Sequence, residues 1–385
     1  MRHFIPELKV IYPGHKMHNE VLNLLIEDGR IKAIGTDVQS DAEEIWPSGL
    51  CLSPGLVDVR ARAYDPGFPE KESISSLLSA ATAGGYTHVG LYPDTLPLVD
   101  NRAVLEYVKG RAKGASAHAV LMGHLSIGGE GADMSEMYDM KAFGARLFTD
   151  GHRPLRNSLF LKVAMEYAAS VNAVLMLRPD DPYLMRSGEV REDLVSHETG
   201  IPGIPAMSEK LGIDRLCELA EYTSCQIHLS SISTIEGVHA LRKWREKGLA
   251  FTADVNIAHL SMNSSGIKNF DSLWKHQPPL GSAEVVKALA NAVSDGLIDI
   301  VSSDHDPQDT EAKDCEFHLA QPGISCIQAS FNLFLKTFGN EQIDLAIDRM
   351  SLAPRRLLQI PMPTLSKDEA ADFVLYALNE KQVFE

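Results

Sequence analysis

The chain has 385 residues, of which 44% are hydrophobic and 23% charged, a composition typical of a folded globular protein. Lysine and arginine together number 36 and aspartate and glutamate 52, so the formal net charge is −16. Because nucleic acids and anionic membranes repel such a surface, we expect neither as a main partner. The five cysteines are odd in number and show no Cys-x-x-Cys spacing, which indicates thiols in a reducing compartment.

Targeting signals are not evident in this sequence. Residues 1–6 lack the long apolar core that is typical of a signal peptide. No apolar run reaches the roughly 20 residues needed to cross a bilayer. We therefore expect a cytoplasmic protein.

Both ends of the chain have the pattern of β-strands. Apolar runs at 21–26 and 31–35 flank the dipeptide Asp28-Gly29, which is a strong signal for a hairpin. A further apolar run occupies 371–378. We predict one discontinuous small β-domain built from residues 1–52 and 353–385.

The middle of the chain, residues 53–352, alternates between strand and helix patterns. The segments expected to be strands are 52–59, 87–92, 118–123, 145–148, 173–177, 226–229, 250–255 and 298–302. Helical patterns lie between them, at 71–83, 207–222, 235–247 and 283–294 among others. Repeated strand–helix alternation of this kind predicts an α/β fold, a (β/α)₈ TIM-like barrel, with its site at the carboxyl ends of the strands.

Several sequence segments carry a resemblance to a known family. They are Pro54-Gly55-Leu56-Val57-Asp58, Ala83-Gly84-Gly85-Tyr86-Thr87, residues 200–206, Pro278-Pro279-Leu280 and Asp304-His305-Asp306-Pro307. Together they resemble dihydroorotases, a branch of the amidohydrolase superfamily, through almost the whole chain. The resemblance implies a barrel of the amidohydrolase type. In active members it also implies a zinc-bound hydroxide that attacks a cyclic amide while an aspartate moves the proton.

Carried over residue by residue, the metal positions of the family are altered here. The four metal histidines correspond to Arg60, Arg62, Arg178 and Ser231. Guanidinium has no free lone pair and stays charged, so arginine cannot bind zinc, and serine is a poor zinc ligand. The family's aspartates after the fourth and eighth strands correspond to Asp150 and Asp304, which remain. We predict no metal and no other cofactor.

The substrate positions of the family are altered too. They correspond to Tyr64, Asp94, Gln277 and Gln308. Tyr64 replaces an arginine and loses its charged fork, and Asp94 replaces an asparagine and would repel a substrate carboxylate. Gln277 replaces an asparagine and Gln308 a histidine. Asp304 occupies the family's general acid/base position, but with these neighbours we expect it to be only structural.

Charge balance gives a physical reason for arginines at the metal-histidine positions. Removing zinc would leave buried aspartates without a counter-charge, which is costly. We therefore expect Arg60, Arg62 and Arg178 to replace the charge of the metal and to pair with Asp304 and Asp150. Alternatively, the clustered arginines bind a small anion.

The leading hypothesis is a dihydroorotase-like protein of pyrimidine biosynthesis without catalytic activity. The resemblance implies a structural partnership with aspartate transcarbamoylase, and homodimers are expected by analogy. One alternative is an active dihydroorotase, a zinc-dependent cyclic amide hydrolase. The other is a small-anion binding protein that uses the arginine cluster.

Overall fold

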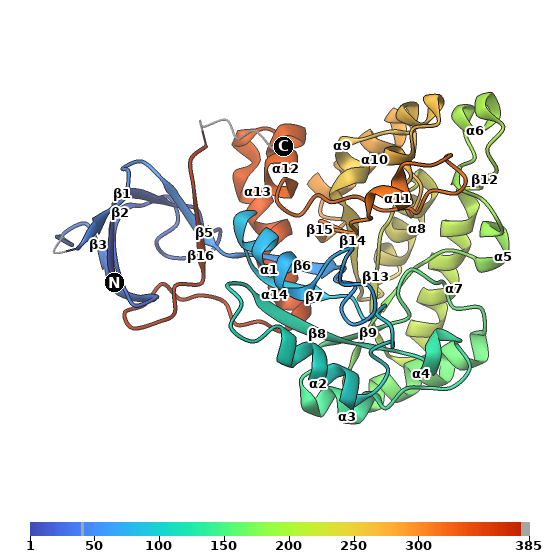
Figure 1. Cartoon of the computed structure of the whole chain (residues 1–385), viewed down its shortest axis with the longest axis horizontal. Helices are drawn as coiled ribbons and strands as arrows, with labels where there is room; N and C mark the ends of the chain where they lie inside the picture. The colour runs from blue at the N-terminus through green and yellow to red at the C-terminus, as the bar shows by residue number, and fades with distance from the viewer. Residues whose placement is uncertain (40–41, 379–385) are drawn as a thin grey trace.

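The computed structural model describes residues 1–39 and 42–378, and its larger sheet is a parallel barrel (Figure 1). Eight strands lie in the order β15-β14-β13-β10-β9-β8-β7-β6. Their bounds are β6 (Leu56–Ala61), β7 (Tyr86–Leu91), β8 (His118–His124), β9 (Leu147–Thr149), β10 (Val174–Leu177), β13 (Gln226–Leu229), β14 (Thr252–Asn256) and β15 (Ile300–Ser302). A parallel bridge between Ala61 and His305 joins the two ends of this sheet, so the barrel is nearly closed. The predicted barrel is confirmed.

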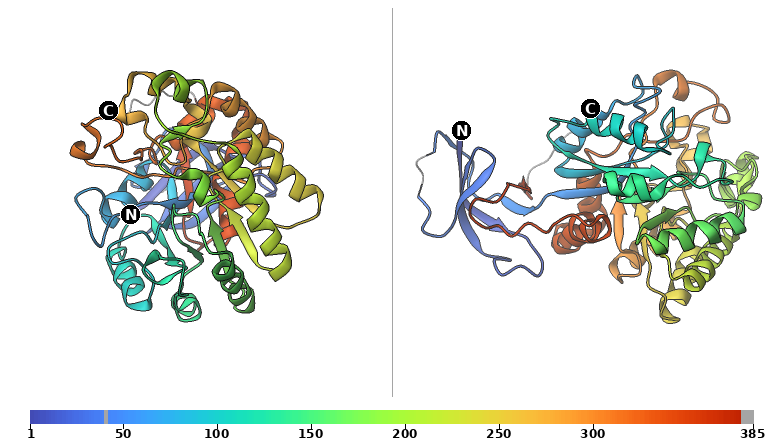
Figure 2. Two further views of the ribbon diagram at one scale, coloured as in Figure 1. Left: turned by 90° about the vertical axis from the view of Figure 1, so that its right-hand side faces the viewer. Right: turned by 90° about the horizontal axis from the view of Figure 1, so that it is seen from below.

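Helices surround the barrel (Figure 2). The principal ones are α1 (Ile74–Ala83), α2 (Arg102–Arg111), α3 (Met137–Phe143), α4 (Ser158–Ser170), α7 (Met207–Thr223), α8 (Ile235–Glu246), α10 (Ala283–Ser294), α12 (Ser330–Phe338), α13 (Ile343–Ile347) and α14 (Ala353–Leu358). Shorter elements occupy the loops: α5 (Pro182–Met185), α6 (Leu194–Thr199), α9 (Ile257–Ser261), α11 (Thr310–Lys313), β11 (Val190–Arg191) and β12 (Gly203–Ile204). The helix predicted from residue 71 begins at Ile74, because the Ser73 side chain caps its first turn.

The smaller sheet is built from both ends of the chain. It contains β1 (Arg2–Val10), β2 (Val21–Glu27), β3 (Arg30–Gly35), β4 (Glu44–Ile45), β5 (Cys51–Pro54) and β16 (Phe373–Tyr376). Strand β16 pairs antiparallel with β5, and β5 pairs parallel with β1. The hairpin predicted around Asp28-Gly29 is confirmed, since β2 and β3 pair antiparallel across it. Figure 1 shows this terminal sheet beside the barrel rather than around it.

The single strand predicted at 52–59 is two strands in different sheets. Strand β5 belongs to the terminal sheet and β6 to the barrel, with Gly55 between them. A Cβ at Gly55 would lie only 2.2 Å from the Thr87 side-chain oxygen, so this junction has no room for a larger residue. Arg355 of α14 donates to the Gly55 carbonyl at 3.1 Å and to Asp372 at 2.7 Å, which ties both chain ends to the barrel.

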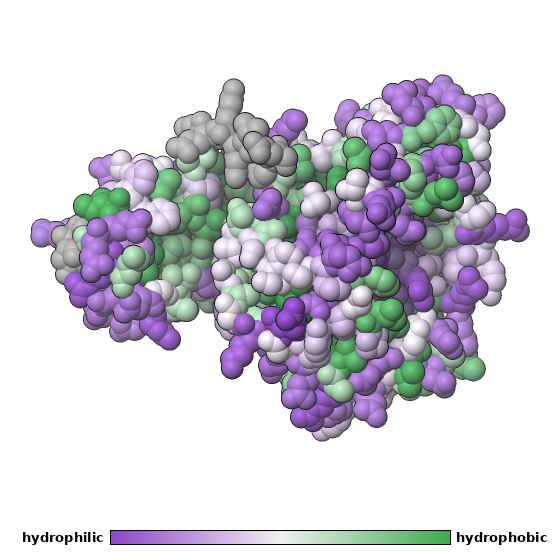
Figure 3. All heavy atoms as spheres, in the orientation of Figure 1, coloured by the Kyte–Doolittle hydropathy of each residue, from purple (hydrophilic) through white to green (hydrophobic). Residues whose placement is uncertain are grey.

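Apolar side chains fill the barrel away from the carboxyl ends of its strands. Five strands and α14 contribute to one buried cluster, which includes Val57, Val59, Val120, Met122, Leu147, Val174, Met176, Ile300, Ala353 and Leu358. Polar side chains therefore concentrate at the other end of the barrel. On the face shown in Figure 3, hydrophilic residues predominate over the barrel and apolar residues are scattered among them. None of the helices formed by the described residues is long and apolar enough to span a membrane.

Candidate functional site at the barrel mouth

The centre of the barrel mouth is occupied by the guanidinium of Arg60. This side chain leaves the carboxyl end of β6 and is only 1% exposed. Its Nε donates to Asp304 Oδ1 at 3.0 Å, and its Nη1 pairs with Asp254. Its Nη2 donates to Ser231 Oγ at 2.6 Å and to the side-chain oxygen of Asn256. Each guanidinium nitrogen thus has a partner from the protein, and the predicted Arg60–Asp304 pair is present.

The partners of Arg60 come from three neighbouring strand ends. Asp254 and Asn256 are two residues apart on β14, so their side chains share one face of that strand. Asn256 Nδ2 donates to Asp304 Oδ2 at 2.6 Å, which ties β14 to the end of β15. Ser231 and Asp304 have positive φ angles of 59° and 49°. Such strained backbone persists only where surrounding contacts hold it, as they do here.

Charge complementarity favours the ionised forms of Arg60 and Asp254. Burial alone would lower the pKa of Arg60, but the carboxylates of Asp254 and Asp304 outweigh it and raise that pKa. Burial alone would raise the pKa of Asp254, but Arg60 and His228 outweigh it and lower that pKa. His228 is packed behind the cluster, with Nε2 3.6 Å from Asp254 Oδ2 and Nδ1 2.8 Å from the Thr252 hydroxyl.

Arg62 organises a second cluster that contains three predicted substrate positions. Its Nη2 lies 2.8 Å from Asp94 Oδ2, and its Nη1 lies 3.6 Å from Asp306 Oδ2. The Tyr64 hydroxyl donates to Asp306 and accepts from Gln308 Nε2 at 2.8 Å. Tyr64, Asp94 and Gln308 therefore direct their polar groups into one internal network.

Asp150 pairs with a histidine, so its predicted pairing with an arginine is wrong. Ser126 donates to the Asp150 carboxylate through its N–H at 2.8 Å and its hydroxyl at 2.6 Å. His124 Nδ1 lies 2.8 Å from Asp150 Oδ1, and His124 Nε2 lies 3.5 Å from Asp94 Oδ1. Burial would lower the pKa of His124, but hydrogen bonds to Asp150 and Asp94 outweigh it and raise that pKa to about 9. The end of β8, which the prediction did not use, thus supplies the counter-charge.

Arg178 forms a separate ion pair with Asp180. Its predicted pairing with Asp304 and Asp150 is therefore also wrong. Its Nε donates to Asp180 Oδ2 at 2.8 Å, only two residues further along the chain. With the Gln277 amide oriented to satisfy both groups, its oxygen accepts from Arg178 Nη2 at 3.0 Å and Nη1 at 3.1 Å. A local carboxylate and an amide therefore satisfy this guanidinium.

Zinc does not fit the residues at this mouth. Three of the four family metal positions carry guanidinium groups, and Ser231 at the fourth accepts a hydrogen bond from Arg60. Across residues 1–39 and 42–378, no group of three or more histidine, cysteine, aspartate or glutamate side chains is arranged to hold a metal ion. Asp254 and Asp304, which are metal-type donors, are bound to Arg60 instead.

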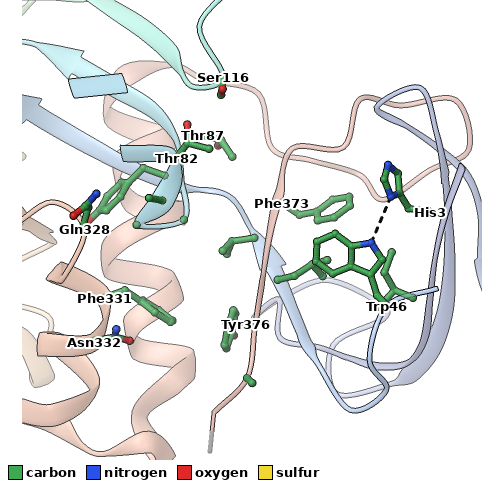
Figure 4. Close-up of a pocket in the computed structure, with 18 of the residues that line it drawn as sticks. His3, Trp46, Thr82, Thr87, Ser116, Gln328, Phe331, Asn332, Phe373 and Tyr376 are labelled. Carbon is green, nitrogen blue, oxygen red and sulfur yellow. Dashed lines mark hydrogen bonds between the residues drawn. The ribbon is translucent and has the colours of Figure 1, made fainter. Parts of the chain in front are cut away.

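A cavity of about 640 Å³ lies at the other end of the barrel (Figure 4). It is lined by His3 and Trp46 of the terminal sheet region, Phe373 and Tyr376 of β16, and Phe331 of α12. Trp46 Nε1 donates to His3 Nδ1 at 3.4 Å. None of the site residues predicted from the sequence lines this cavity, so the barrel mouth remains the candidate site.

Comparison with known proteins decides the family. A model of the "Dihydro-orotase-like" family matches residues 49–237. A dihydroorotase of Syntrophus aciditrophicus is 32% identical over 373 residues, which cover 95% of this chain and 87% of that protein. One of Geobacter metallireducens is 33% identical over 372 residues, with coverage of 95% and 88%. The chain belongs to the dihydroorotase family.

Solved structures with low sequence identity agree on the fold. The L-hydantoinase of Arthrobacter aurescens superposes with a TM-score of 0.83 at 19% identity, covering 96% of this chain and 86% of that one. A D-hydantoinase gives 0.80 at 18% identity, with coverage of 97% and 86%. This dihydroorotase-family chain therefore has the same barrel with a terminal sheet as those proteins.

The sequence-based prediction missed four residues that complete the clusters: His124, Asp254, Asn256 and Asp306. The sequence held a usable signal for three of them. Asp254 and Asn256 alternate at the end of an apolar strand, which places both side chains on one face. Asp306 follows Asp304 by the same spacing. Only the fold reveals that His124 reaches Asp150.

Proposed function

We propose that this dihydroorotase-family protein has no hydrolase activity and serves a structural role in pyrimidine biosynthesis. One observation carries the proposal: the Arg60 guanidinium fills the barrel mouth and binds Asp254, Asp304 and Ser231. The Arg60 guanidinium cannot activate a water molecule as zinc does, because guanidinium does not act as a Lewis acid.

Asp304 is also badly placed to act as a general base. Its Oδ1 accepts from Arg60 at 3.0 Å and its Oδ2 accepts from Asn256 at 2.6 Å. A base must be within hydrogen-bonding reach of the proton that it removes, and here both oxygens are already directed at protein donors. Its role in this proposal is to neutralise Arg60.

The names of the relatives favour the alternative, an active dihydroorotase. The two proteins compared above carry that name at 32% and 33% identity over most of this chain. Under this alternative the mouth would have to bind zinc after a rearrangement of Arg60 and Arg62. Their identity to this chain is counted over its whole length, whereas the proposal depends on a few side chains at the strand ends.

Metal content and turnover together test the proposal. The full chain is purified from medium supplemented with zinc, and bound zinc is measured by elemental analysis. Ring closure of carbamoyl aspartate and ring opening of dihydroorotate are then measured. We expect no stoichiometric zinc and no turnover above that of buffer. Stoichiometric zinc with turnover would establish the alternative. The variant R60H/R62H serves as a comparison, and it should still fail to hold zinc because Arg178 and Ser231 remain.

We further propose aspartate transcarbamoylase as the partner in this structural role, supported by the family resemblance alone. Co-expression of the two proteins followed by size-exclusion chromatography tests this part. We expect the two proteins to elute together in a fixed ratio, and separate elution would rule out this partnership. The same chromatography of the protein alone tests the expected homodimer.

The arginine cluster as an anion site receives less support. Arg60, Arg62 and Arg178 are each paired with a carboxylate of the chain. Their charge is therefore already neutralised by fixed groups, which leaves little to attract a free anion.

A further inference from the structure

A cavity of about 420 Å³ opens at the rim of the barrel mouth, next to the cluster of Arg62, to which its lining residue Asp150 is linked through His124 and Asp94. Loops that follow β8, β9 and β10 form it, through residues 129–131, 150, 152–157, 182, 185 and 186. In Figure 1 the helices next to these loops, α4 and α5, lie at the side of the barrel away from the terminal sheet. Its volume is within the range usual for small-ligand sites, roughly 300–1,000 Å³.

Three arginines line this rim pocket without a direct ion pair among the described residues, and the Asp94 carboxylate acts on Arg153 only at longer range. Arg153, Arg156 and Arg186 are exposed, and none forms an ion pair with any residue in the described part of the chain. The carboxylates that line the pocket are Glu130 and Asp150, and Asp150 is already bound to His124 and Ser126. The pocket is therefore locally positive, although the whole chain has a formal charge of −16.

A fourth arginine lies beneath the same loop. Arg215 of α7 donates from Nη2 to the Leu155 carbonyl at 2.6 Å and from Nη1 to the Arg156 carbonyl at 3.4 Å. Its buried Nε has no hydrogen-bond partner among residues 1–39 and 42–378, and the Asp181 carboxylate acts on it without forming a direct ion pair. Arg215 thus fixes the backbone that presents Arg156 and adds a further positive charge.

The start of α4 adds to this positive potential. Asn157 lines the pocket and caps this helix of 13 residues, accepting from Leu159 N at 3.0 Å and Phe160 N at 3.2 Å. The amino end of a helix carries a partial positive charge that favours anions. The partial positive charge at the start of α4 and the arginines therefore both favour an anionic ligand.

We propose that this rim pocket binds a small phosphate-bearing anion. Guanidinium groups present paired donors that match phosphate oxygens, and three of them line this one cavity. The site goes beyond the proposed structural role and does not rest on it, because neither Arg60 nor Arg62 lines the pocket.

Titration calorimetry of the full chain tests the site, with inorganic pyrophosphate as the probe and constant ionic strength. We expect saturable binding of one pyrophosphate per chain. R156Q and R186Q should each weaken binding about tenfold, because each variant loses charged hydrogen bonds to the anion. The matched control is R242Q, since Arg242 is an exposed arginine on α8 that pairs with Asp295 at 3.8 Å. It should bind as the unaltered chain does.

Three results would overturn the proposal. They are the lack of saturable pyrophosphate binding, equal weakening by R242Q, and full binding by the double variant R156Q/R186Q. Succinate provides a second arm, and binding of succinate as tight as that of pyrophosphate would assign the pocket to carboxylates instead. Zinc and turnover play no part in these measurements, so their outcome is separate from that of the proposed function.

Discussion

Two groups of arginines follow the strand ends of the same barrel, and they differ in what surrounds them. Arg60 is 1% exposed and is bound by Asp254 and Asp304, whereas Arg153 and Arg156 at the rim are exposed and form no ion pair with the described residues. A buried guanidinium must be neutralised by fixed carboxylates, because desolvation without a partner is costly. At the rim, water solvates the guanidinium groups, so their charge needs no fixed carboxylate and can attract an anion. The same residue type therefore serves structure in one place and recognition in the other.

The largest effect is expected from Arg60→Ala. Removal of this guanidinium leaves Asp254 and Asp304 buried without a counter-charge, so the free energy of unfolding should fall by about 3–5 kcal/mol. Denaturant titration monitored by circular dichroism measures it. The control variant R60A/D254N/D304N removes the stranded charges and should recover part of the loss. A loss below about 1 kcal/mol for Arg60→Ala would refute a structural role of this network.

An intermediate effect that depends on pH is expected from His124→Gln. The pKa of His124 is raised to about 9 by Asp150 and Asp94 against the effect of burial. A raised pKa contributes stability that is complete below the unfolded value of 6.5 and is lost as the pH rises through 9. The variant should therefore be less stable by a few kcal/mol near pH 6, with the deficit shrinking between pH 6.5 and 9.

Unfolding titrations at three pH values check this behaviour. Measurements at pH 6, 8 and 10 bracket the expected window, and His239→Gln on α8 supplies a histidine control with no resolved ion pair among the described residues. A deficit that is the same at all three pH values would show that His124 acts by packing and not by charge.

The smallest effect is expected from Arg156→Gln. An exposed arginine without an ion-pair partner contributes little to folding, so stability without ligand should change by no more than about 0.5 kcal/mol. The same denaturant titration used for Arg60→Ala measures it. A loss comparable to that of Arg60→Ala would remove the distinction between the buried and the rim arginines.

The sequence predicted the centre of the site better than its edges. Arg60 and Asp304 are fixed by strand ends, so the family frame locates both, and their pair is present in the structure. Asp150 and Arg178 lie at strand ends as well, but their partners are His124, Asp180 and the Gln277 amide. These partners depend on the paths of loops, which periodicity along a strand does not encode.

The fold was predicted in the same uneven way. The segments 226–229 and 283–294 coincide with β13 and α10, because each carries a complete pattern of its own period. The break at Gly55 was missed, although Ser53-Pro54-Gly55 interrupts the apolar pattern there, because the pattern does not show that the residues on either side belong to different sheets. The two-residue strands β11 and β12 were also missed, because two residues show no period.

The pairing of β16 with β5 has a consequence for folding during synthesis. Strand β5 emerges from the ribosome early, yet its antiparallel partner Phe373–Tyr376 lies close to the other end of the chain. Until that partner arrives, one edge of β5 is open to other strands, and open edges invite aggregation. The pairing of β16 with β5 can therefore form only after the whole barrel has been synthesised.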